Sequence, residues 1–280
     1  MSAAGPPQGA NCAPSGGVGV VMSELAPLRL SCRSLAVSVA GRTLIPSLDL
    51  HVRAGECWAI VGPNGAGKTT LVATLAGLFP PRGGEIAYDG TPLAALSPRA
   101  RALRRGYLPQ DSVDYFPASV LETALAGRHP HLARWQWESA VDIERATAAL
   151  AAFGLAGLEH RDVRTLSGGE RRRVALAALL AQDPALLLLD EPSSHLDLGA
   201  QVAALDTLAQ WARAGGKAIV MVLHDLHLAL RYADHAIAIG GGRAVTGVAR
   251  DVLTADVLSP LFGHPLLAVG EGTARTLVPV

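Results

Sequence analysis

The segment Gly62–Thr69, GPNGAGKT, constrains the fold of this chain more than any other feature. It follows a short apolar run, Cys57–Val61, and precedes KTTLVATLAGLF, which has the apolar pattern of a helix. Glycines let the backbone N–H groups of such a loop point into one concavity, and a helix start adds partial positive charge. Because strand, glycine-rich loop and helix agree, the segment is predicted to be a phosphate-binding P-loop rather than a chance turn.

Two parts of a nucleotide site follow from this prediction. Lys68 is expected to reach the β- and γ-phosphates, and the hydroxyl of Thr69 to bind Mg²⁺. Asp190 ends the apolar run PALLLLDEP, where its carboxylate is expected to hold Mg²⁺ through water, and Glu191 is expected to point toward the γ-phosphate. A helix cap is the alternative role for this acidic pair. The predicted phosphate-binding residues are Gly62, Pro63, Asn64, Gly65, Ala66, Gly67, Lys68, Thr69 and Thr70.

Strand patterns and helix patterns alternate along the chain, which indicates an α/β fold with an open, mostly parallel sheet covered on both faces. Residues from about 112 to 165 are expected to form an inserted helical lobe. Residues 1–27, rich in Gly, Pro, Ala and Ser, are expected to be a disordered extension. The expected strands cover residues 28–39, 44–52, 55–62, 83–90, 184–192, 217–225 and a hairpin at 235–248; the expected helices cover 68–79, 198–216 and 226–233.

Composition excludes several classes of protein. The 24 basic residues balance the 24 acidic residues, which argues against a general nucleic-acid binder. The three cysteines, Cys12, Cys32 and Cys57, form no CxxC pair, so the chain is expected to be reduced and intracellular, without a cysteine metal site. No apolar run is long enough to span a bilayer, and no signal peptide is recognisable. Translation from Met1 and from Met22 both remain open.

A second glycine motif decides between the many classes of P-loop protein. Leu166–Glu170, LSGGE, closely resembles the signature sequence of ABC ATPases, which usually ends in Gln. Gln110 in GYLPQDS resembles the Q-loop of that family, Asp197 in SSHLD the D-loop, and His224 in VLHD the switch histidine. The marks occur in family order, and the resemblance covers residues 28–248. A GTPase is disfavoured because neither asparagine of the chain can belong to an N-K-x-D motif.

The resemblance implies a P-loop NTPase core with a mostly parallel sheet, an N-terminal antiparallel β lobe and an inserted α-helical subdomain, followed by a tail, residues 249–280, that packs on the core. It also implies that two copies pack head to tail, with ATP between the P-loop of one copy and the signature of the other. Ser167 and the N–H groups of Gly168 and Gly169 would then approach the γ-phosphate of the partner's ATP, with Asp197 nearby. A side chain at either glycine would block that approach.

The same resemblance assigns roles in hydrolysis. Glu191 is expected to act as general base or to position the attacking water, and His224 to contact the γ-phosphate. Gln110 is expected to sense Mg²⁺ and to link the site to the helical lobe. The Glu170 that replaces the usual Gln is expected to have little effect. The cluster Arg171–Arg173 is expected to be a solvated helix face, the alternative being that one member lies near Glu170 or the partner.

One position departs from the family. The family stacks adenine on an early aromatic residue, whereas alignment puts Val39 there, and no Tyr, Phe or Trp lies between Leu28 and Cys57. Base stacking on an aromatic residue is worth about 1–3 kcal/mol. The sequence therefore predicts weaker nucleotide binding and looser discrimination between ATP and GTP.

The kind of ABC protein is predicted from shorter segments. The chain is expected to serve a separate polytopic permease at the cytoplasmic face of the cell membrane, and indirectly a periplasmic or extracellular substrate-binding protein. Residues 119–142 and 247–266 resemble importer subunits for iron–siderophore, haem and cobalamin uptake. A nucleic-acid- or ribosome-acting ABC protein and an assembly scaffold are the alternatives.

Residues 119–142 also contain four side chains that need an explanation. His129 and His131 in GRHPH are expected to belong to a surface loop rather than to a metal site, because no carboxylate or cysteine cluster accompanies them. Trp135 and Trp137 are expected to pack within the helical lobe or to contact a partner.

Overall fold

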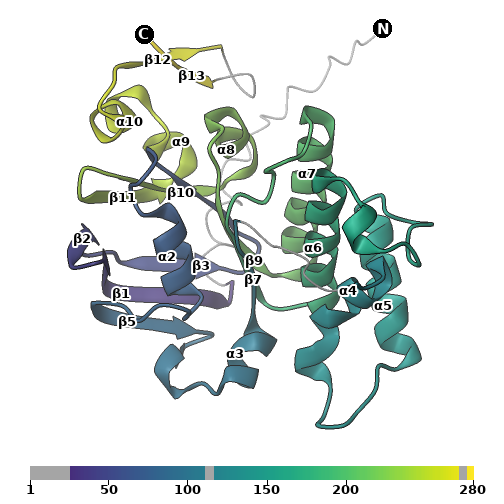
Figure 1. Cartoon of the computed structure of the whole chain (residues 1–280). Coiled ribbons are helices and arrows are strands. Elements are labelled where there is room, and N and C mark those ends of the chain that lie inside the picture. The colour runs from purple at the N-terminus through teal and green to yellow at the C-terminus, as the bar shows by residue number, and fades with distance from the viewer. Residues whose placement is uncertain (1–25, 111–116, 271–275) are drawn as a thin grey trace, which may run out of the picture.

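A computed structural model describes residues 26–110, 117–270 and 276–280. The expected disordered extension, apart from its last two residues, and the choice between Met1 and Met22 therefore lie outside the described residues. Within them the chain forms two β-sheets, a helical lobe and a small C-terminal hairpin (Figure 1). The predicted α/β fold is confirmed.

The central sheet has six strands in the order β11-β10-β4-β9-β8-β7. The pairs from β10 to β7 are parallel, and β11 joins the edge antiparallel to β10. Strands β4, β8 and β9 are buried along their whole length, as expected of parallel strands covered on both faces. The strands are β4 (Cys57–Val61), β7 (Arg105–Leu108), β8 (Leu186–Leu189), β9 (Ala218–Val222), β10 (His235–Gly240) and β11 (Arg243–Val248).

A second, antiparallel sheet forms the N-terminal lobe around the long strand β1 (Leu28–Val39). The expected single strand over residues 44–52 is wrong: it is divided into β2 and β3, with Pro46 between them, because proline cannot donate to a strand ladder. The other strands of this lobe are β2 (Arg42–Ile45), β3 (Leu50–Arg53), β5 (Gly83–Tyr88) and β6 (Thr91–Pro92).

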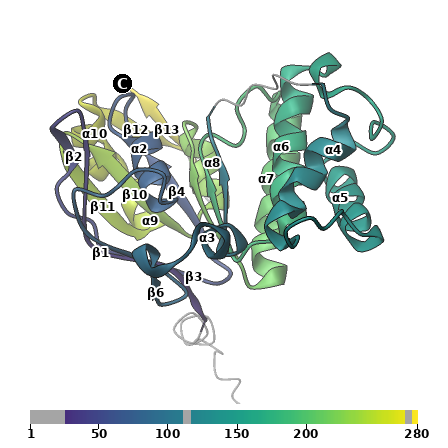
Figure 2. The same cartoon turned by 60° about the horizontal axis from the view of Figure 1, so that its bottom comes forward.

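The helical lobe lies at the opposite side of the molecule from the antiparallel sheet (Figure 2). It extends beyond the expected end at residue 165, because α6 packs against both α4 and α5. Its elements are α4 (Val120–Leu125), η2 (Ala126–His131), α5 (Ala140–Ala152), η3 (Val163–Thr165) and α6 (Gly168–Gln182).

Two apolar clusters lie on the two faces of the central sheet. In β4 the side chains of Cys57, Ala59 and Val61 belong to one cluster, and those of Trp58 and Ile60 to the other, as the alternation of a strand requires. The first cluster is continuous with the core of the helical lobe and also includes Leu258, Leu261 and Leu277 of the C-terminal segment.

The remaining helices connect these layers. Helix α2 ends at Leu75, four residues before its expected end, because Gly77 takes a left-handed φ of +73°. These helices are α2 (Lys68–Leu75), η1 (Leu93–Ala95), α3 (Pro98–Arg104), α7 (Leu198–Gly215), α8 (Leu226–Tyr232), α9 (Ala249–Val252) and α10 (Ala255–Phe262). The C-terminal hairpin pairs β12 (Leu266–Val269) with β13 (Thr276–Pro279).

Candidate nucleotide-binding site

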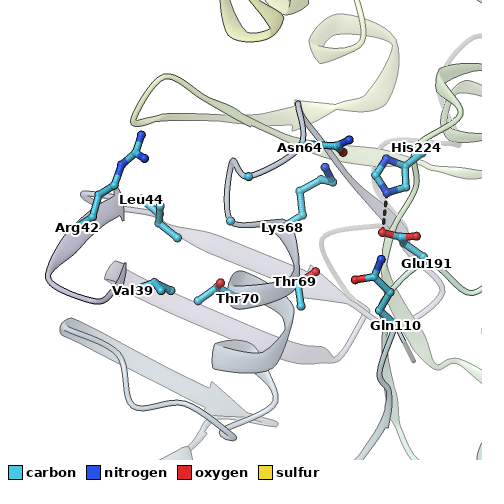
Figure 3. A pocket seen from close by; sticks show the side chains of 12 residues that line it. Val39, Arg42, Leu44, Asn64, Lys68, Thr69, Thr70, Gln110, Glu191 and His224 are labelled. Carbon is cyan, nitrogen blue, oxygen red and sulfur yellow. Dashed lines mark hydrogen bonds and ion pairs between the residues drawn. The ribbon is translucent and has the colours of Figure 1, made fainter. Parts of the chain in front are cut away.

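A cavity of about 490 Å³ opens where the P-loop, the ends of the central strands and the antiparallel lobe meet (Figure 3). It lies at the carboxyl ends of parallel strands, where α/β proteins bind their ligands. Nine of the predicted site residues line it: Asn64, Gly65, Gly67, Lys68, Thr69, Thr70, Gln110, Glu191 and His224.

Lys68 is held at the base of this cavity by the loop that precedes it. Its Nζ donates to the carbonyl oxygens of Gly62, at 2.8 Å, and Pro63, at 3.0 Å, and the residue is 7% exposed. Burial lowers the pKa of the ammonium group, and the carboxylates of Glu191 and Asp190 oppose that shift. The N-terminus of α2 begins at Lys68 and adds its N–H groups, so this end of the cavity suits an anion such as a phosphate chain.

Asp190 has the surroundings of a cation ligand. It is 0% exposed, and neither carboxylate oxygen accepts a hydrogen bond from the described residues. Burial raises the pKa of this carboxyl group, the nearby hydroxyl of Thr69 opposes the rise, and the negative charge of Glu191 adds to it. A buried carboxylate without a well-formed hydrogen bond is costly unless a cation compensates it, so the group, with the Thr69 hydroxyl beside it, fits a divalent ion such as Mg²⁺.

Glu191 and His224 form a pair at the edge of the cavity (Figure 3). The Oε1 atom of Glu191 accepts from Nε2 of His224 at 2.6 Å. Glu191 follows the buried strand β8 and takes a φ of +51°, a left-handed conformation that is unfavourable for a residue with a side chain. Strain of this kind is typical of functional positions, and it turns the carboxylate toward the imidazole rather than into a helix cap.

The far side of the cavity comes from the hairpin between β1 and β2. Val39 and Arg42 are directly paired across its turn, so their side chains share one face. Both line the cavity together with Leu44, and no aromatic residue among the described residues does. Sequence reasoning identified Val39 but missed Arg42 and Leu44, although their closeness to Val39 across a two-residue turn, Ala40-Gly41, was a usable signal.

The signature residues do not line this cavity. Ser167 is the N-cap of α6: its hydroxyl accepts from the N–H of Glu170, and the carboxylate of Glu170 accepts from the N–H of Ser167. Glutamine makes the same capping box, so the exchange of Gln for Glu170 keeps the start of the helix. Asp197 is likewise an N-cap, accepting from the N–H of Ala200 at 2.8 Å.

Packing within this chain accounts for glycine at position 169. A Cβ atom added there would lie 3.0 Å from the carbonyl oxygen of His195, in the D-loop. At Gly168 the nearest atom, Cβ of His195, would lie at an ordinary 3.7 Å. Close packing within the chain therefore accounts for glycine at position 169 but not at position 168.

The expectation of a solvated arginine face is wrong for Arg172. This residue is 4% exposed and donates to backbone carbonyl oxygens beside the cavity, including those of Gln110 and Glu191. Arg171 and Arg173 are half-buried. Arg171 donates to the carbonyl oxygen of Leu166, and Arg173 donates to that of Phe153.

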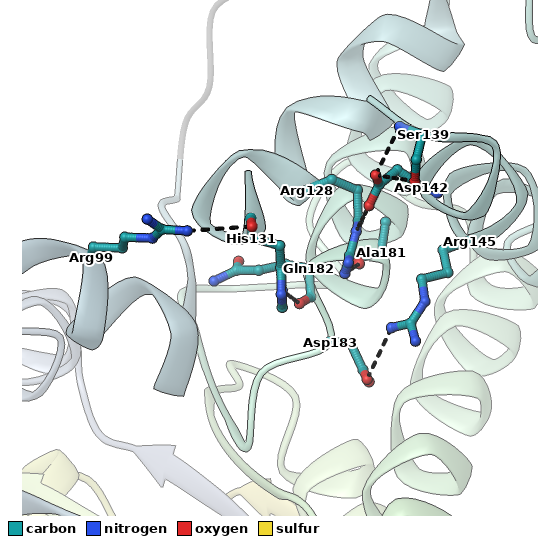
Figure 4. A network of polar contacts seen from close by, with 9 residues as sticks. All are labelled: Arg99, Arg128, His131, Ser139, Asp142, Arg145, Ala181, Gln182 and Asp183. Carbon is teal, nitrogen blue, oxygen red and sulfur yellow. Dashed lines mark hydrogen bonds and ion pairs between the residues drawn. The ribbon is translucent and has the colours of Figure 1, made fainter. Parts of the chain in front are cut away.

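The GRHPH segment has a structural role at the end of α6 (Figure 4). Arg128 donates to the carbonyl oxygen of Ala181 at 2.8 Å, and Nε2 of His131 lies 2.7 Å from that of Gln182. These contacts satisfy carbonyl groups that the end of a helix leaves unpaired. The expectation that Trp135 and Trp137 pack within the helical lobe is wrong, since their exposed fractions are 89% and 87%. The alternative, that they contact a partner, stays a prediction.

Residues 26–110, 117–270 and 276–280 contain no cluster of His, Cys, Asp and Glu side chains that could hold a metal ion. No helix among them is long and apolar enough to cross a membrane.

Comparison with known proteins identifies relatives by sequence. The "Hemin import ATP-binding protein HmuV" of Myxococcus xanthus is 46% identical over 231 residues, which are 80% of this chain and 85% of that protein. The "Ferric enterobactin transport ATP-binding protein FepC" of Escherichia coli is 35% identical, covering 89% and 92%. The "Cobalamin import ATP-binding protein BtuD" of Halobacterium salinarum is 37% identical, covering 90% of this chain and 63% of that protein.

Comparison of structures and of family models agrees with this result. One solved structure, a metal-chelate type ABC transporter in an inward-facing conformation, has a TM-score of 0.79 and 27% identity, covering 90% of this chain and 98% of the matched chain. The family model described as ABC transporter matches residues 45–194. The chain therefore belongs to the ABC transporter family, of which it is an ATP-binding ATPase subunit.

Proposed function

We propose that this chain binds and hydrolyses ATP to energise an importer for an iron chelate, haem or cobalamin. The names of its relatives support these three cargoes, because they are import proteins for hemin, ferric enterobactin and cobalamin. The observation that carries the proposed hydrolysis is the Glu191–His224 pair, 2.6 Å apart, on the wall of a cavity that also contains Lys68.

The chemistry divides among residues of the cavity. Lys68 and the start of α2 neutralise the phosphate chain, since both present positive charge to it. Glu191 accepts a proton from the attacking water or orients it, and His224 fixes the position of that carboxylate and contacts the γ-phosphate. Water adds to the γ-phosphorus as the bond to the β–γ bridging oxygen breaks, which releases ADP and phosphate.

A magnesium ion is part of the proposal. Asp190 and Thr69 would hold it, with Gln110 as a further oxygen donor from the neighbouring strand end. When bound, Mg²⁺ neutralises charge on the β- and γ-phosphate oxygens. The buried carboxylate of Asp190, which makes no well-formed hydrogen bond and lies beside the hydroxyl of Thr69, supports this assignment.

A second copy of the chain would complete the site. Ser167 and the N–H groups of Gly168 and Gly169 lie at the start of α6, outside the cavity that contains Lys68. In a head-to-tail dimer they would bind the γ-phosphate in the partner's cavity, with Asp197 adjoining. A polytopic permease would hold the pair at the cytoplasmic face of the membrane, and a substrate-binding protein outside would deliver the cargo.

Hydrolysis is tested with Glu191→Gln. The variant is expected to bind ATP and to dimerise, while kcat falls by about 10²–10⁴-fold because a general base is lost. ATPase assays and size-exclusion chromatography with ATP measure these properties, with the exposed Glu144→Gln as control. Near-normal turnover by the Glu191 variant would remove this residue from its proposed role.

Cargo is tested by uptake in a strain that lacks this chain. Transport of a ferric siderophore, haem and cobalamin is measured separately, with wild type or the Glu191→Gln variant restored. One of the three is expected to be lost in the deletion strain and recovered only with wild type. Unchanged uptake of all three would contradict the importer proposal while leaving the ATPase intact.

A further inference from the structure

Helix α6 sends one arginine into the interior beside the cavity. Arg172 is 4% exposed, and every hydrogen bond described for it goes to a backbone carbonyl oxygen of the segments that follow β7 and β8. Its acceptors are Pro109 at 2.8 Å, Gln110 at 3.2 Å, Asp190, Glu191 at 2.7 Å and Pro192 at 3.4 Å.

These acceptors lie where two neighbouring strands stop. Strands β7 and β8 pair in parallel up to Leu108 and Leu189, and one further bond joins the N–H of Asp190 to the carbonyl of Leu108. Beyond that point, no further hydrogen bond joins the described residues of the two segments. A planar guanidinium group presents five N–H donors from three nitrogens in a fixed fork, and so it can bind more carbonyl groups of the two segments than a lysine, with three donors on one nitrogen, or an amide, with two.

The two segments that Arg172 joins, one after β7 and one after β8, carry side chains of the proposed hydrolysis site. Gln110 follows β7 and Glu191 follows β8, and both line the cavity. We propose that Arg172 is a positioning residue for ATP hydrolysis, which fixes the backbones of Gln110 and Glu191 relative to each other. The inference rests on the proposed ATP hydrolysis and adds to it a residue that does not itself reach the cavity.

The position of Arg172 on α6 gives this contact a second consequence. The helix begins with Ser167–Gly169, the segment proposed to bind the partner's nucleotide, only one turn before Arg172. A shift of α6 would therefore move the guanidinium group of Arg172 and, through its hydrogen bonds, the backbones of Gln110 and Glu191 in the same chain. One arginine thus connects the nucleotide of one site with the hydrolytic side chains of the other.

The test separates positioning from binding and from folding. Full-length wild type, Arg172→Lys and Arg172→Gln are compared for kcat, for MgATP affinity and for thermal unfolding. Arg173→Gln is the matched control: it lies on the same helix and also donates to a backbone carbonyl, but that carbonyl belongs to Phe153 in the helical lobe.

Both Arg172 variants are expected to lower kcat by about 10–100-fold, because small displacements of catalytic groups have effects of that size, while MgATP affinity stays within about threefold. Arg173→Gln should keep kcat within about threefold. Wild-type kcat in the Arg172→Lys variant would overturn the proposal, since lysine keeps the positive charge but lacks the planar set of N–H donors. Equal losses of affinity and kcat would also overturn it, and an inactive wild type would instead contradict the proposed function.

Discussion

At the scale of single residues, the hairpin end of the cavity has an unusual surface for binding a base. Val39 is 47% exposed there and faces the same side as Arg42. An aliphatic side chain offers a nucleobase contact area without the stacking that an aromatic ring supplies. The phosphate end, by contrast, is densely provided with donors from Lys68 and α2. We therefore expect this chain to bind nucleotides mainly through their phosphates.

Val39→Tyr tests this expectation. The variant should bind ATP about tenfold more tightly, because base stacking is worth about 1–3 kcal/mol and the site at the turn is open. It should also separate ATP from GTP more clearly. Isothermal titration with ATP, GTP and inorganic tripolyphosphate measures both effects, and tripolyphosphate serves as control because it has no base. Unchanged ATP affinity would show that no base stacks at this position.

The environment of Arg172 was open to sequence reasoning, but only in part. Arg172 is four residues before Leu176 and seven before Leu179, which is the spacing of one helix face, and both leucines are buried. This spacing is compatible with a buried Arg172, but it does not single it out, because Arg173 also lies three and four residues before the buried Leu176 and Ala177. The acceptors of the Arg172 hydrogen bonds could not be predicted, because they lie at strand ends far away in the sequence. Gln110 is 62 residues from Arg172, and Glu191 is 19 residues from it.

At the scale of elements, a buried ion pair joins three parts of the helical lobe (Figure 4). Arg128 in η2 donates to Asp142 in α5 at 2.8 Å and to the end of α6, and both charged side chains are less than 10% exposed. Asp142 also accepts from the hydroxyl and N–H of Ser139, the N-cap of α5. Bonds from Ser139 and then from Arg128 hold the pKa of this carboxyl group well below its usual range.

Asp142→Asn is expected to destabilise the fold by about 3 kcal/mol, because it leaves a buried guanidinium without its counter-ion. A carboxyl group with a lowered folded pKa stabilises the native state above its unfolded pKa, and that contribution fades as pH falls. The difference from wild type should therefore be constant between about pH 6 and 8 and shrink below about pH 4.

Urea unfolding at several pH values measures this difference. Asp251→Asn, which removes an exposed ion pair with Arg250, is the control and should have no measurable effect. A difference between wild type and Asp142→Asn that persists undiminished at pH 3 would contradict the assignment to an ionised Asp142.

Sequence patterns predicted β4, β8, β9, the β10–β11 hairpin and α7 well, since each combines an apolar pattern with clear stop signals, but they missed the edge strand β7. They failed where tertiary contacts decide. The helical lobe includes α6 because that helix packs on α4 and α5, which nothing in the order of the motifs indicates. The GRHPH segment has the composition of a surface loop, yet Arg128 is buried and binds the end of α6.

At the scale of the whole molecule, the two halves of the proposed catalytic site lie apart on one chain. The cavity with Lys68, Glu191 and His224 is one half, and the start of α6 at Ser167 is the other. Because Ser167 does not line that cavity, the halves would meet only between two copies. Dimerisation and turnover are therefore expected to depend on the same residues.

Ser167→Arg should block closure of the dimer. MgATP affinity of the single chain should stay within about twofold, while kcat falls by at least tenfold because donors to the transferred phosphate are withheld. The dimer trapped by Glu191→Gln should disappear on size-exclusion chromatography when Ser167→Arg is added. Full activity of the variant would contradict a shared site.

Ser119→Arg is a matched control for this experiment. Ser119 caps α4 with the same capping box as Ser167, here with Glu122, so its loss costs a comparable amount of stability. It is not part of either proposed half, and its substitution should leave ATP turnover unchanged.

The backbone of Glu191 has a consequence for how this chain would change under artificial selection. A residue with a side chain at φ +51° lowers stability, whereas glycine or asparagine tolerates that conformation. Directed evolution for heat resistance alone, blind to ATP turnover, should therefore drift toward Gly or Asn at this codon. The most heat-resistant variants would then no longer hydrolyse ATP. Selection for growth on the imported nutrient would instead favour variants that keep glutamate at this position.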